Sequence, residues 1–70
     1  MSVDTRTGVV VGFDEHVGLG TVRDDAGEEL FFHCTQIADG SRMVAIGVAV
    51  RFVVVPAHKG VYQAVEIRPA

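Results

Sequence analysis

The segment from Val17 to His33 limits most strongly what this chain can fold into, because it has the pattern of a β-hairpin. Two short runs rich in β-branched and aromatic residues flank a polar stretch that contains Asp24, Asp25 and Gly27. The two carboxylates can bond their own backbone and the glycine can adopt a positive φ, so this stretch favours a tight, solvated turn. We expect strands over residues 17–23 and 29–33.

The remainder of the chain repeats this pattern of short apolar runs and turns. Further strands are expected over residues 7–13, 48–55 and 61–67, because each run is rich in valine and is bounded by Gly, Pro or charged turn residues. In the last run the side chains should alternate, with Val65 and Ile67 on one face and Ala64 and Glu66 on the other. Five short strands without a helix of ten residues predict an all-β fold, a small five-stranded antiparallel β-barrel.

Single residues mark where these strands bend or end. Gly12 indicates a β-bulge or a close backbone approach in the first strand. Pro56 should end the fourth strand, because proline has no amide hydrogen to donate to a sheet. Thr35 is the predicted cap of one helical turn over residues 35–38.

Length and composition indicate one globular domain over residues 1–70, with its core between about residues 6 and 68. The 70 residues are 49% hydrophobic and 21% charged, which is too apolar for a disordered chain. The single cysteine, Cys34, excludes an intramolecular disulfide and is expected to act as a small hydrophobic residue rather than a reactive thiol. Neither a secretory signal nor a membrane span is recognisable, so we expect a cytoplasmic protein that does not bind membranes.

Charge argues against strong binding of nucleic acid. The net charge is −3, and the six Lys and Arg residues are scattered. Attraction to phosphates requires a local excess of cations, so any such surface must be small.

The order of motifs nevertheless resembles that of the bacterial cold-shock domains. The matching runs are Gly-Val-Val-Val-Gly-Phe at 8–13, Val-Gly-Leu-Gly-Thr-Val at 17–22, Leu-Phe-Phe-His-Cys at 30–34, Thr-Gln-Ile at 35–37, Asp-Gly at 39–40, Gly47 and Lys-Gly at 59–60. The resemblance implies a barrel of the oligonucleotide-binding (OB) type. It also implies a platform of exposed rings on the first three strands, on which the bases of single-stranded DNA or RNA stack.

This chain departs from the family pattern mainly on that platform. The positions at which the family has rings are Gly12, Leu19, Thr21 and Cys34, and the positions at which it has lysines are Val11 and Val17. The rings that remain are Phe13, Phe31 and His33. Phe31 and His33 should share one face of their strand, with Phe32 in the core. The two exposed rings could stack on bases, or form a bare surface without a ligand.

The resemblance therefore implies a divergent, weakened single-strand binding protein, an RNA chaperone or a regulator of gene expression. Its candidate stacking residues are Phe13, Phe31 and His33, and Arg23, Arg42 or Lys59 would contact phosphates. We expect no catalytic activity, cofactor or metal, because the sequence has no nucleophile triad, phosphate-binding loop or Cys/His cluster.

An alternative function uses the same face without nucleic acid. Val11, Val17, Leu19 and Phe31 would form an apolar patch there, and exposed apolar patches commonly mark protein contacts. The occupant would be a second copy of the chain or another protein, unless a loop covers the patch.

Overall fold

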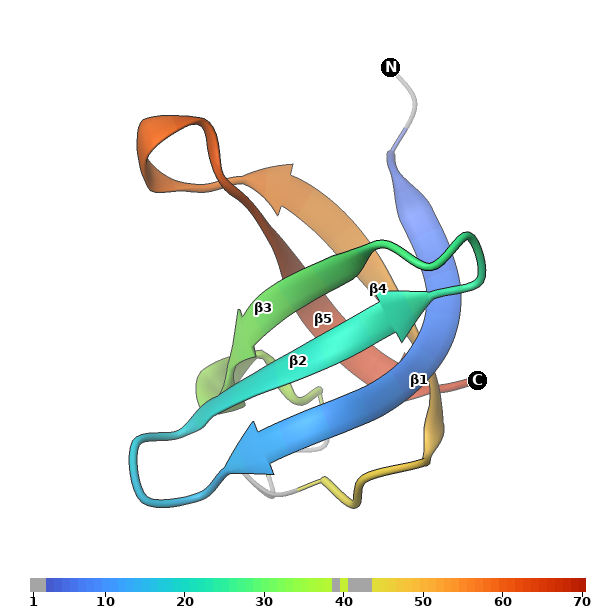
Figure 1. Ribbon diagram of the computed structural model, residues 1–70, viewed down its shortest axis with the longest axis vertical. Helices are drawn as coiled ribbons and strands as arrows, with labels where there is room; N and C mark the ends of the chain where they lie inside the picture. Colours follow the sequence, from blue (N-terminus) through green and yellow to red (C-terminus); the bar gives the residue numbers. More distant parts are fainter. Residues whose placement is uncertain (1–2, 39, 41–43) are drawn as a thin grey trace.

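The strands of the chain close into a barrel (Figure 1), and the computed structural model describes residues 3–38, 40 and 44–70. The elements are β1 (Thr5–Asp14), β2 (Leu19–Asp24), β3 (Glu29–His33), the 3₁₀ helix η1 (Cys34–Gln36), β4 (Ala49–Pro56), the 3₁₀ helix η2 (His58–Gly60) and β5 (Tyr62–Pro69). Around the barrel the order is β1-β2-β3-β5-β4. The predicted five-stranded barrel of the OB type is confirmed. Its neighbouring strands pair antiparallel except at the junction of β3 with β5, which is parallel.

The core fills the barrel with apolar side chains from every strand. The buried residues are Val10, Val22, Leu30, Phe32, Ile37, Val50, Phe52, Val54, Ala64 and Ile67. On β2, β3 and the first half of β4 they alternate with exposed or half-buried residues, as one-sided burial requires. Arg51 is accordingly exposed between the buried Val50 and Phe52.

The turn before β2 replaces the start of the predicted strand. Gly18 has a φ of 73°, and its amide donates to the carbonyl of Asp14 at 2.8 Å. Val17 and Gly18 therefore belong to the turn, and the prediction of a strand from residue 17 is wrong. The glycine adopts a left-handed conformation that would strain most other residues.

A β-bulge in β1 confirms the first of the two roles predicted for Gly12. The register with β2 shifts between Val10 and Gly12, which pair with Val22 and Thr21. The extra residue turns Phe13 inward, where an uninterrupted strand would have pointed it outward. A Cβ atom at Gly12 would have nothing within 4 Å, so the alternative of a close backbone approach is wrong.

A second irregularity makes the predicted alternation of the last strand wrong. Ala64 and Ile67 are both buried, and Glu66 between them has a φ of 54°. The register of β5 with β4 shifts at the same point, between Arg51 and Val53 of β4. One additional residue in β5 therefore reverses the faces of the residues that follow.

Within the described residues, no helix is long and apolar enough to cross a bilayer.

Candidate nucleic-acid interface

The outer surface of β2 and β3 carries two exposed rings, those of Phe31 and His33, and Tyr62 of β5 is a further exposed ring outside it. Phe31 is 63% exposed, His33 is also exposed, and Phe32 between them is buried, so the predicted alternation is confirmed. In the register of the two strands, Leu19 lies opposite His33 and Thr21 opposite Phe31. These four side chains, Leu19, Thr21, Phe31 and His33, form what we call the β2–β3 face.

Thr35, two residues further along the chain, holds the His33 side chain in place. The Nδ1 of His33 accepts a hydrogen bond from the backbone amide of Thr35 at 3.3 Å and lies 2.9 Å from the Thr35 hydroxyl oxygen. An Nδ1 that accepts from an amide places the proton of a neutral imidazole on Nε2, which can then donate to a ligand. The same contact makes His33 the cap of η1, so the prediction that Thr35 caps this turn is wrong.

Phe13 lies at the edge of this surface and partly in the core. It is half-buried, and its ring is stacked on that of Phe32 with centroids 6.0 Å apart and planes at 13°. Because the bulge turns it inward, it offers a ligand less of its ring than Phe31 does.

The adjoining part of β1 adds little to the β2–β3 face. Gly12 lies opposite Thr21 and has no side chain, and Asp14 lies opposite Leu19 with an exposed carboxylate. The family's ring positions at Gly12, Leu19 and Thr21 thus meet in one continuous area, which this chain leaves without aromatic side chains.

Part of the predicted apolar patch is clearly exposed. Val17 is 61%, Leu19 48% and Phe31 63% exposed, whereas Val11 is half-buried within the bulge. Cys34 is half-buried and packs against the core.

Of the cations proposed to contact phosphates, Arg23 is exposed on the same side of β2 as Leu19 and Thr21, so it borders the β2–β3 face. Arg23 lies opposite Glu29, and its Nη2 is 2.7 Å from the Glu29 carboxylate, which offsets its charge locally. Lys59 is exposed in η2, in the connection between β4 and β5. Arg42 lies outside the described residues.

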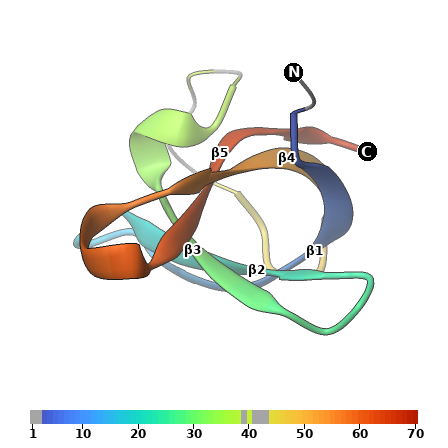
Figure 2. The same cartoon turned by 90° about the horizontal axis from the view of Figure 1, so that it is seen from above.

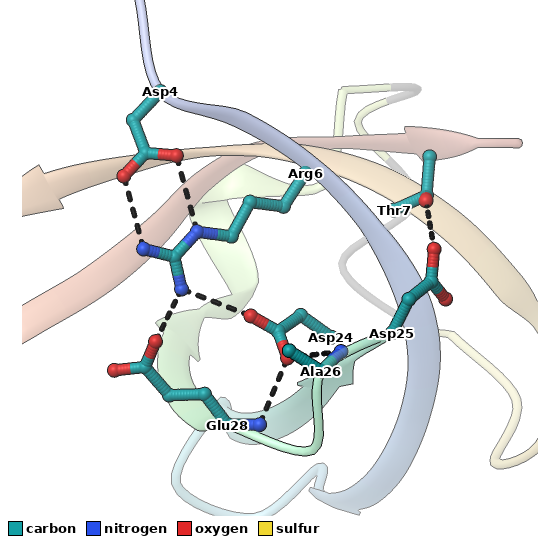
Figure 3. Close-up of polar contacts among 7 residues, drawn as sticks. All are labelled: Asp4, Arg6, Thr7, Asp24, Asp25, Ala26 and Glu28. Carbon is teal, nitrogen blue, oxygen red and sulfur yellow. Dashed lines mark hydrogen bonds and ion pairs between the residues drawn. The ribbon is translucent and has the colours of Figure 1, made fainter.

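A polar cluster beneath the hairpin turn was missed at the sequence level (Figure 3). Arg6 of β1 contacts three carboxylates: Asp4 at 3.0 Å, Asp24 at 2.9 Å, and Glu28. Asp24 is buried, so the prediction of a solvated turn is wrong at this residue. Arg6 and Asp24 are far apart in the sequence, so no pattern of neighbouring residues predicts their pairing.

The cluster keeps Asp24 ionised and ties the β2–β3 hairpin to β1. The backbone amide of Glu28 donates to Asp24 at 2.8 Å and that of Ala26 at 3.0 Å. The Glu28 amide, together with the Arg6 guanidinium and the Ala26 amide, holds the pKa of Asp24 below its usual value. Because the exposed rings Phe31 and His33 lie on β3, which this hairpin joins to β2, the anchoring fixes the β2–β3 face relative to β1.

The chemistry offered by the β2–β3 face is that of contact and stacking. It presents one phenyl ring, one imidazole, one aliphatic side chain and one hydroxyl group. In the described part of the chain, no three His, Cys, Asp or Glu residues are grouped so that they could hold a metal ion.

Comparison with known proteins agrees with the barrel and its motifs. Curated proteins give no match to the chain. The model of the 'cold-shock' DNA-binding domain family matches residues 6–70. This match covers all five strands and both bulges, and it confirms the resemblance derived from the sequence. The chain therefore belongs to the 'cold-shock' DNA-binding domain family, whose members bind nucleic acids.

Proposed function

We propose that this chain binds single-stranded DNA or RNA weakly, through the β2–β3 face. The observation that carries the proposal is the ring of Phe31, which is 63% exposed on a strand paired with β2. An exposed ring on a rigid strand is ready to stack on a base without further ordering of the backbone. His33 follows two residues later on the same face and offers a second stacking surface.

The small number of rings makes the proposed binding weak. Stacking contributes about 1–3 kcal/mol for each base, and this face has two well-exposed rings. Phe13 adds only the edge that the core leaves exposed. Phosphate attraction adds little, because Arg23 is already paired with Glu29 and the net charge is −3. Arg23, Arg42 and Lys59 remain the proposed phosphate contacts.

Membership of the family supports a role in RNA chaperoning or in regulating gene expression. The chain would act by binding rather than by catalysis, without a cofactor, in the cytoplasm of a bacterium. Weak, sequence-tolerant stacking suits a protein that must bind and release many strands.

The direct test is fluorescence anisotropy with labelled oligo-dT and oligo-U of seven nucleotides at low salt. Replacing Phe31 with Ala should weaken binding by about 5- to 150-fold, which corresponds to one lost stacking contact. Val3→Ala is the matched control, since Val3 is 67% exposed but lies before β1. The proposal is overturned if the unmodified chain shows no binding at high micromolar concentration, or if Phe31→Ala binds equally well.

A second function, contact with another protein or a second copy of the chain, is favoured by the exposure of Val17, Leu19 and Phe31. Burial of these side chains would stabilise a complex by the hydrophobic effect, which depends little on salt. Nucleic-acid binding instead weakens steeply as salt rises. Light scattering distinguishes a homodimer, because the measured mass would then increase with protein concentration and would decrease in Leu19→Ser.

A further inference from the structure

Two arginines lie opposite each other on a part of the barrel that the β2–β3 face does not include. Arg51 of β4 pairs in register with Arg68 of β5, and both side chains are exposed. In the barrel order β2 borders neither β4 nor β5, and Figure 2 shows the end of β5 across the barrel from β2. Like charges placed directly opposite on adjacent strands repel each other and destabilise a sheet.

The bulge at Glu66 creates this pairing. Ala64 is buried, so strict alternation would also direct residues 66 and 68 into the core. The additional residue in β5 instead leaves Ile67 buried and both Glu66 and Arg68 exposed. A glutamate with a φ of 54° lies in a region that is unfavourable for residues other than glycine. The backbone is therefore strained at Glu66, and the bulge at this residue brings Arg68 to the surface.

The two arginines line a hollow in which guanidinium groups outnumber carboxylates by two to one. The hollow has a volume of about 280 Å³ and is lined by Thr5, Arg51, Phe52, Val53, Glu66 and Arg68. The hydroxyl of Thr5 adds a possible neutral donor to the two guanidinium groups. One carboxylate is present, that of Glu66, which lies 4.0 Å from Arg68. In the described part of the chain no carboxylate is within ion-pair distance of Arg51.

We propose that Arg51 and Arg68 form an anion site that takes a phosphate group. Guanidinium groups bind phosphate through paired hydrogen bonds, and a bound dianion or phosphodiester would remove the repulsion between the two arginines. The source of the group is either free phosphate or the backbone of a nucleic-acid strand. The site stands on a different surface from the β2–β3 face, so it does not depend on the proposed function.

Thermal unfolding in inorganic phosphate, compared with chloride at equal ionic strength, tests the site. The melting temperature of the unmodified chain should rise by about 6–11 °C when phosphate is tenfold above its Kd. Arg51→Gln and Arg68→Gln should each lose more than half of this rise. Glu15→Gln, which removes an exposed carboxylate in the turn before β2, should leave this rise unchanged, whereas Glu66→Gln should increase it. An equal rise in the unmodified chain and all these variants would show a general salt effect and overturn the proposal.

A second measurement identifies the source of the phosphate. If a nucleic-acid backbone occupies the site, Arg51→Gln should reduce the slope of log K against log salt for oligo-dT by about one. If that slope is unchanged while the phosphate-dependent rise is lost, the ligand is free phosphate. Phe31→Ala should keep the full response to phosphate, so failure of the nucleic-acid proposal would be seen separately.

Discussion

Gly20 of β2 and Phe32 of β3 lie opposite each other, and a Cβ atom at Gly20 would lie only 2.3 Å from Cζ of Phe32. The same Cβ atom would be 3.0 Å from Cδ1 of Phe13. The absence of a side chain at Gly20 therefore allows both rings to stack beneath the β2–β3 face. Glycine at this position therefore serves the close packing of β2 against β3.

Gly20→Ala should reduce the free energy of unfolding by about 1–3 kcal/mol, because a buried aromatic ring must move to accommodate the methyl group. Gly12→Ala is the matched control, since a Cβ atom there would meet nothing within 4 Å. We expect the control to change stability by less than about 0.5 kcal/mol. Urea denaturation followed by circular dichroism measures both values, and equal losses would contradict this account of Gly20.

Gly12→Trp should strengthen binding of oligo-dT. Gly12 lies opposite Thr21 beside Phe31, in open space and without a left-handed φ, so a large ring can be accommodated there. One added stacking contact corresponds to an affinity gain of about 5- to 150-fold. The chain has no other tryptophan, so quenching of the new indole fluorescence reports binding directly.

The control for this gain is Val3→Trp, which places an indole before β1. Its fluorescence should respond little to oligo-dT. Similar quenching in both variants would show that the gain does not come from the β2–β3 face.

Stability should decrease as the pH falls below about 4, in part because of Asp24. The folded-state pKa of this carboxyl is lowered from the ordinary 3.8, chiefly by the amide of Glu28, with further contributions from Arg6 and Ala26. The unfolded chain then binds the proton more readily, so the stabilisation is fully present above the unfolded pKa and is lost as the pH falls through the folded pKa. Asp24→Asn keeps an oxygen acceptor but no charge. The difference in melting temperature between the two proteins should be largest near neutral pH and shrink below pH 4. A constant difference from neutral pH to pH 2 would exclude this role for Asp24.

At residue 66 the usual ranking of alanine and glycine should be reversed. In an ordinary strand, a glycine lowers the free energy of unfolding by about 0.5–1 kcal/mol relative to an alanine. Because Glu66 has a φ of 54°, the free energy of unfolding of Glu66→Gly should instead be about 1 kcal/mol higher than that of Glu66→Ala. Both substitutions remove the same charge, so the comparison isolates the backbone. Chemical denaturation of the two variants measures this difference in free energy. A more stable alanine variant would argue against strain at this position.

The barrel could be predicted from the sequence because its strands depend on local patterns. Alternating burial and turn residues are encoded within a few neighbouring positions, and β3 was predicted with its observed bounds. The bulge at Gly12 could also be predicted, because a glycine inside a strand often marks a bulge.

The candidate site was harder to predict from the sequence, because it depends on which residues of neighbouring strands lie opposite each other. Glu66 carries no sign of its positive φ, and the bulge there reverses the faces of the residues that follow. Phe13 was assigned to the platform, although the first bulge turns it towards Phe32. The pairing of Arg6 with Asp24 is a tertiary contact between segments that share no local pattern.

The pairing of Phe31 with Gln63 is the register pair that joins β3 to β5 and closes the barrel. β3 is paired with β2 along its whole length, so transient opening requires the least free energy at the β3–β5 junction. Amide hydrogens on the β5 side of β3 should therefore exchange with solvent earlier than those shared with β2. If a nucleic-acid strand stacks on Phe31 as proposed, it should slow this exchange, so hydrogen exchange would link ligand binding to the opening of the barrel.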